Sequence, residues 1–99
     1  MHEWLVTIET EKYVGDADPI EAFERFSELL EASGVEFPSG SVHDRAFSAT
    51  LIVSAEGTEE ALRLAARSFT DALLEALGDL PLLARVRVEL VEEREPVLA

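Results

Sequence analysis

The sequence predicts an α+β fold whose elements follow the order strand, helix, strand, strand, helix, strand. Three stretches alternate apolar and polar side chains with the period of two typical of half-buried strands: residues 3–11, 45–55 and 85–93. Two longer stretches between them repeat apolar residues at the spacing of an amphipathic helix. This order predicts a split βαβ arrangement, in which a four-stranded antiparallel sheet carries both helices on one face and leaves the other face open.

The inward face of the predicted sheet is defined by the apolar residues of the three clear strands. They are Trp4, Val6 and Ile8, then Phe47, Ala49, Leu51 and Val53, and finally Val86, Val88 and Leu90. A weaker signal lies between them, where Val35 and Phe37 favour a short strand that Pro38 interrupts. Proline in a strand points to an edge position, and we expect the hairpin turn between Ser39 and Asp44.

The first helix is expected to begin at Pro19, with Asp18 as its N-cap and Glu21 in the capping-box position. Gly34 is placed to end it. The buried stripe of this helix is predicted to be Phe23, Phe26 and Leu30, flanked by Ile20 and Leu29.

The second helix is expected to begin with Thr58 as its N-cap and to end near Gly78 and Pro81. Arg67 and Asp71 are spaced as an ion pair one turn apart. The buried stripe is predicted to be Leu62, Ala65, Phe69, Ala72, Leu73 and Ala76.

Acidic residues dominate the charge of this chain, since 21 of them against eight basic residues give a formal net charge of −13. Nucleic acids and anionic membranes both attract basic proteins, so we expect neither as a partner. Solubility is the favoured explanation of the charge, and a basic protein partner or a DNA-mimicking surface is the alternative. Such a partner would dock on the acidic strip of the first helix, formed by Glu21, Glu24, Glu28 and Glu31.

The chain contains no cysteine, which excludes disulfides, thiolate zinc sites and cysteine nucleophiles. The first residues lack the basic and apolar regions of a signal peptide. No stretch approaches the ~20 apolar residues of a membrane helix. These observations predict a cytoplasmic location.

His43 and Asp44 form an adjacent pair of residues suited to acid–base or metal chemistry. Neighbouring residues of an extended segment point to opposite faces, and no second ligand lies nearby in the sequence. A surface turn is therefore the favoured interpretation. We assign no catalytic, cofactor-binding or metal-binding residue.

The element order resembles the ferredoxin-like α/β sandwich over nearly the whole chain, so residues 1–99 are expected to form a single domain of that fold. Three segments also resemble a group of small actinobacterial proteins of unknown function: Tyr13-Val14-Gly15, residues 46–53 and residues 85–89. This resemblance implies an accessory or regulatory module and transfers no functional residue.

The strand order of ferredoxin-like folds would place the first and third strands in the middle of the sheet. Their outward residues and those of the last strand would form a flat, mildly apolar patch: Leu5, Thr7, Thr50, Ile52, Arg85, Arg87 and Val91. An uncovered patch of this kind marks an interaction site, and we expect a two-fold homodimer through it. RNA readers of this fold stack bases on central aromatic residues, and none is present at these positions, so RNA binding is rejected.

Arg85 and Arg87 have two interpretations. They form ion pairs with Glu3, Glu9 or Glu11 of the first strand, which is favoured, or they bind a carboxylate on the open face.

The sequence thus predicts a small cytosolic regulatory or protein-interaction module that is homodimeric through its open sheet face. A small-ligand sensor, with a metabolite held between paired sheets, is one alternative. A dimeric α+β-barrel enzyme is another, but it requires polar groups between sheet and helices. The inward residues supply only the indole of Trp4, so enzymatic activity is not expected.

Overall fold

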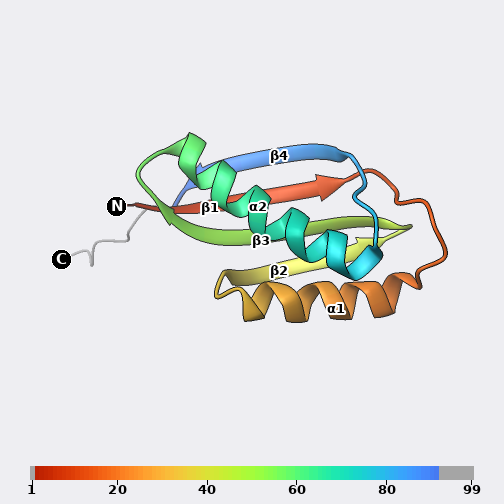
Figure 1. Cartoon of the computed structure of the whole chain (residues 1–99). Coiled ribbons are helices and arrows are strands. Elements are labelled where there is room, and N and C mark those ends of the chain that lie inside the picture. The colour runs from red at the N-terminus through yellow and green to blue at the C-terminus, as the bar shows by residue number, and fades with distance from the viewer. Residues whose placement is uncertain (1, 92–99) are drawn as a thin grey trace, which may run out of the picture.

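The computed structural model describes residues 2–91 of the chain, and these form one sheet and two helices (Figure 1). The elements are β1 (His2–Thr10), α1 (Pro19–Ala32), β2 (Glu36–His43), β3 (Ala46–Ala55), α2 (Thr58–Leu77) and β4 (Leu83–Leu90). Neighbouring strands are antiparallel and the order across the sheet is β2-β3-β1-β4. Both helices lie on the same side of the sheet (Figure 1). The predicted α+β fold and element order are confirmed.

Strand register places the predicted apolar residues of the central strands on the side of the helices. Val6 lies opposite Leu51 of β3 and Val88 of β4, and Ile8 lies opposite Ala49. Val6, Ile8 and Leu51 are fully buried. The Trp4 indole Nε1 donates a hydrogen bond to the Ala55 carbonyl at 3.0 Å, which satisfies its one polar atom.

The centre of the core is an aromatic cluster around Phe26 of α1. Its ring lies edge-on to Phe47 of β3 and Phe69 of α2, with centroids 5.4 and 5.2 Å away. Phe37 of β2 makes a third such contact at 6.2 Å. One side chain thus joins both helices to the sheet, and edge-to-face pairs of this kind add to the free energy gained by burial.

Helix α1 begins as the sequence predicts, because the Asp18 carboxylate accepts a hydrogen bond from the Glu21 backbone N–H at 3.1 Å. The predicted cap of α2 is wrong. Gly57 occupies the N-cap position without a side-chain hydrogen bond, and Thr58 is the first helical residue. At the other end, Gly78 adopts φ 73°, the left-handed conformation that ends a helix.

Strand β2 is longer than the sequence predicts. It continues through Pro38, because the register shifts between Glu36 and Ser39 and this bulge accommodates the missing N–H. A Cβ at Gly40 would lie 2.5 Å from the ring of Phe37, so glycine leaves room for that ring. The turn therefore falls later, at Asp44 and Arg45.

Strand β4 is less covered than the sequence predicts. Val86, expected to be inward, is 38% exposed, and Leu90 is 49% exposed. Leu62, expected in the buried stripe of α2, is also 38% exposed. The reason is that α2 packs mainly on β3 and β1 and only marginally on β4 (Figure 1). The expected end of this strand at residue 93 and the charged tail from Glu92 to Ala99 lie outside the described residues.

We expect Phe26→Ala to destabilise the fold by ~3–5 kcal/mol, because it removes a fully buried ring from the aromatic cluster and leaves a cavity. Urea unfolding followed by circular dichroism measures this change. Ile20→Ala is the matched control on the same helix: Ile20 is 67% exposed, so its loss should change stability by less than ~0.5 kcal/mol. Equal effects of the two substitutions would contradict the assigned core.

Candidate interaction surface

The open face of the sheet brings the predicted patch together. Leu5 lies opposite Ile52, and Thr7 lies opposite Thr50, at the centre of the two middle strands. The Thr7 and Thr50 hydroxyl oxygens are 3.1 Å apart, a hydrogen-bonding distance. All four side chains are half-buried by their neighbours in the sheet. The result is a flat surface of short hydroxyls beside one apolar pair, with no aromatic ring at its centre.

The β4 side of this open face carries charged pairs. Arg85 Nε lies 3.6 Å from Glu9 Oε2 across the β1–β4 ladder, which confirms the favoured interpretation for Arg85. Arg87 Nη1 instead lies 3.5 Å from Glu89 Oε1 on its own strand. Val91 extends the ladder beyond β4, since its N–H donates to the Glu3 carbonyl at 3.0 Å. These pairs are exposed and contribute little to stability, so both arginines can exchange partners cheaply.

A groove that the sequence did not predict lies at one corner of the sheet. The β2–β3 ladder ends at Glu36 and Ile52, so within the described chain residues 53–55 of β3 pair with β1 alone. The groove occupies this corner and has a volume of about 460 Å³. No sequence pattern locates it, because it depends on how far β2 follows β3.

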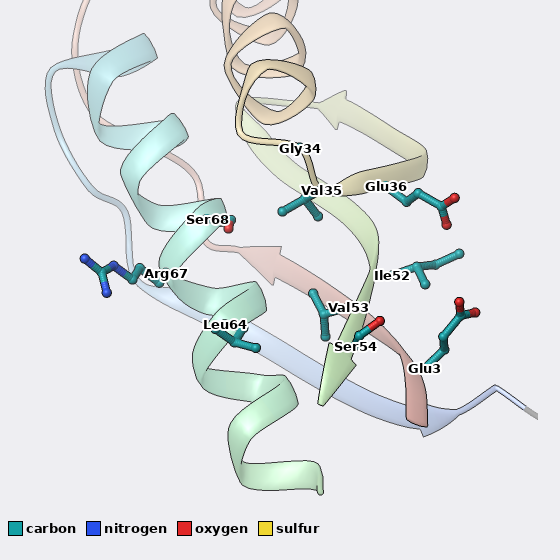
Figure 2. A pocket seen from close by; sticks show the side chains of 10 residues that line it. All are labelled: Glu3, Gly34, Val35, Glu36, Ile52, Val53, Ser54, Leu64, Arg67 and Ser68. Carbon is teal, nitrogen blue, oxygen red and sulfur yellow. The ribbon is translucent and has the colours of Figure 1, made fainter. Parts of the chain in front are cut away.

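The groove is apolar inside and acidic at one rim. Val35, Val53 and Leu64 surround it between β3 and α2 (Figure 2). Glu3 and Glu36 lie beyond β3, on the open-face side (Figure 2). Arg67 also lines the groove, but Figure 2 shows its guanidinium pointing away from it. The groove is thus suited to an apolar group next to a positive charge.

The hairpin turn that contains His43 and Asp44 is fixed to the loop after β1. Asp44 and Arg45 have φ values of 47° and 66°, as the two central residues of a type I′ turn require. Arg45 Nε donates to the Tyr13 carbonyl at 3.2 Å, and its guanidinium lies 4.2 Å from the centroid of the Tyr13 ring. These contacts stabilise the left-handed backbone conformation of Arg45, which is not a glycine. They account for the conformation of the turn on structural grounds alone.

Lys12 and Asp44 form an ion pair at 2.5 Å in this turn. The hydrogen bond and the charge of Lys12 hold the pKa of the Asp44 carboxyl below its ordinary value, with smaller contributions from His43 and Arg45. Among residues 2–91, no group of three His, Cys, Asp or Glu side chains is placed to hold a metal ion.

The helices differ from the sequence prediction in one ion pair. Arg67 and Asp71 do not approach within 4.0 Å, whereas Arg25 of α1 reaches Glu75 of α2 at 3.4 Å and joins the two helices.

Neither helix of the described chain is long and apolar enough to span a membrane.

Replacing Lys12 by glutamine should raise the pKa of the Asp44 carboxyl toward its ordinary value. In the wild-type protein this pair stabilises the fold above the pKa that Asp44 has in the unfolded chain, and the contribution is lost as pH falls through the lowered folded value. An NMR titration of the Asp44 carboxyl carbon measures the shift. Arg25→Gln, which removes a cation that pairs with Glu75 instead, should leave this titration unchanged.

Comparisons with protein-family models, with curated proteins and with solved structures found no match. The function is therefore inferred from the surfaces described above.

Proposed function

We propose that this chain is a ferredoxin-like protein-interaction module, cytoplasmic and regulatory in role, that forms a homodimer through the open face of its sheet. One observation carries the proposal: both helices lie on one side of the sheet, so the Leu5–Ile52 pair and the surrounding hydroxyls have no cover from the described chain. Flat sheet faces of this composition pack well against a second copy of themselves. The expected contacts are Leu5, Thr7, Thr50, Ile52, Arg85, Arg87 and Val91.

The size of the open face supports this proposal. Four strands spaced ~4.8 Å apart and about eight residues long present a face of roughly 19 by 26 Å. Two such faces together supply about 1,000 Å², the lower bound for a specific protein interface. The hydroxyls of Thr7 and Thr50 bond each other, so burying them leaves only one of their two O–H groups in need of an acceptor from the second copy.

The double substitution Leu5→Asp/Ile52→Asp should abolish association through the open face and leave the chain folded, because it places four carboxylates in the interface. Sedimentation velocity at several protein concentrations measures the mass, and circular dichroism checks the fold. Adding Val91→Asp to these two should have the same result.

Raising the salt concentration should strengthen the wild-type dimer, since it screens repulsion between two chains of net charge −13.

Leu82→Asp is the matched control, because Leu82 is apolar, 77% exposed and outside the open face. This variant should dimerise as the wild type does. A wild-type protein that remains monomeric at high concentration, or a dimer that Leu5→Asp/Ile52→Asp leaves intact, would refute the open-face interface.

A second candidate function, a small-ligand sensor, is favoured by the corner groove. Its volume falls in the range of small-molecule sites, and its apolar wall beside Glu3 and Glu36 fits an organic cation with a short apolar chain. Such a ligand raises the melting temperature by mass action.

A thermal-shift series with butylammonium to octylammonium should then show stabilisation that increases with chain length. Glu3→Gln/Glu36→Gln should reduce the shift, and Glu24→Gln/Glu28→Gln on α1 should not. An equal shift in all three proteins would indicate nonspecific binding to an acidic surface and would exclude the groove.

A further inference from the structure

The two outer strands of the sheet differ in how well they are protected against pairing with another chain. Strand β2 carries Pro38 and a bulge, and α1 packs beside it. All three features block the addition of a strand. Strand β4 has an irregularity only at its start, opposite Glu9 and Thr10, and is regular from Arg85 to Leu90. It contains no proline, and no charged side chain lies on its helix side. Strand β4 is therefore the exposed edge of the sheet.

The backbone groups free to pair on β4 can be assigned from the ladder. Val91 donates its N–H toward β1, and successive residues of a strand direct their backbone groups to opposite sides. Val86, Val88 and Leu90 therefore direct N–H and C=O away from the sheet. Their side chains lie on the helix side, where Val86 and Leu90 are 38% and 49% exposed. Free backbone groups and uncovered apolar side chains thus belong to the same three residues.

We propose that β4 is a second self-association surface, which pairs antiparallel with β4 of another copy about a two-fold axis at Val88. In this register Val88 lies opposite Val88 of the second copy, and Val86 lies opposite Leu90. The three residues with outward backbone groups then form a complete hydrogen-bonded ladder. The two sheets join into one of eight strands.

Charge favours this register over its two neighbours toward the start of the strand. With the axis at Val88, Arg87 of each copy lies opposite Glu89 of the other, and no like charges face each other directly. An axis at Arg87 would set the two Arg87 side chains against each other, and an axis at Val86 would set Arg85 against Arg87. Opposite charges directly across a ladder stabilise it, and like charges destabilise it. The existing Arg87–Glu89 pair of 3.5 Å is exposed and exchanges for the intermolecular pair at little cost.

This edge is separate from the open-face interface and does not depend on it. The two proposals predict different responses to the same variants, so either can fail alone. Leu5→Asp/Ile52→Asp acts on the open face alone. Arg87 belongs to both surfaces, so Arg87→Glu/Glu89→Arg is made in the Leu5→Asp/Ile52→Asp background, where it tests only the pairing of β4.

Cysteine cross-linking of the full chain tests the register directly, because the natural sequence has no cysteine. In Val88→Cys the two cysteines would face each other at ~5.5 Å between Cα atoms, within the range for a disulfide. In Val86→Cys they would be four residues out of register, roughly 13 Å apart along the strands. Mild oxidation should therefore cross-link Val88→Cys in high yield and Val86→Cys hardly at all. Equal yields, or none from Val88→Cys, would overturn the proposal.

Charge exchange supplies the second readout. Arg87→Glu alone should weaken β4 association on the order of tenfold, since two attractive pairs become repulsive. Arg87→Glu/Glu89→Arg should restore it, because each copy then offers the opposite charge at both positions. Circular dichroism checks that each variant is folded. A double variant no better than Arg87→Glu would overturn the register even if a dimer forms by another surface.

Discussion

The packing of Phe26 between the two helices and the sheet is the contact on which the rest of the structure depends. Its ring meets Phe47 of β3, Phe69 of α2 and Phe37 of β2, so three separate elements share one centre. That centre lies toward β2 and β3, so the helices pack toward that side of the sheet. Helix α2 consequently covers β1 and β3 and leaves β4 with apolar residues in solvent. The side chains of this aromatic cluster lie on the side of the sheet away from β4, and this is why β4 is the exposed edge.

The same asymmetry explains why the two edges are built differently. Strand β2 must lie under α1, and Pro38 with its bulge bends it toward Phe26 through Phe37. The corner groove lies where the β2–β3 ladder ends, at Glu36 and Ile52. Strand β4 meets α2 only marginally and is regular from Arg85 to Leu90. Its regularity preserves an uninterrupted row of free backbone groups, which is the feature that strand pairing needs.

Local signals in the sequence were sufficient to predict α1 and the central strands. Asp18, Pro19 and Glu21 act within a single turn, and the alternation in β1 and β3 reflects burial on one face. The predictions of Thr58 as a cap and of Leu62 as a buried residue were wrong, and Val86 lies on the predicted helix side but is 38% exposed. The last two depend on which part of the sheet α2 crosses, and periodicity identifies an apolar face without saying whether a neighbour covers it. The turn at Asp44 and Arg45 was placed too early because it relies on Tyr13, which is distant in sequence. The open-face residues do share one face, since alternation alone decides that.

The two proposed surfaces are compatible in space, because one uses the face of the sheet and the other its edge. A chain that used both would not stop at a dimer: two different two-fold contacts per copy generate either a closed tetramer or an open array. The net charge of −13 opposes growth, since each added copy meets the repulsion of those already assembled. That repulsion is long-range and screened by salt, whereas the apolar and backbone contacts are short-range. Acidity therefore sets the protein concentration and ionic strength at which assembly passes beyond two copies.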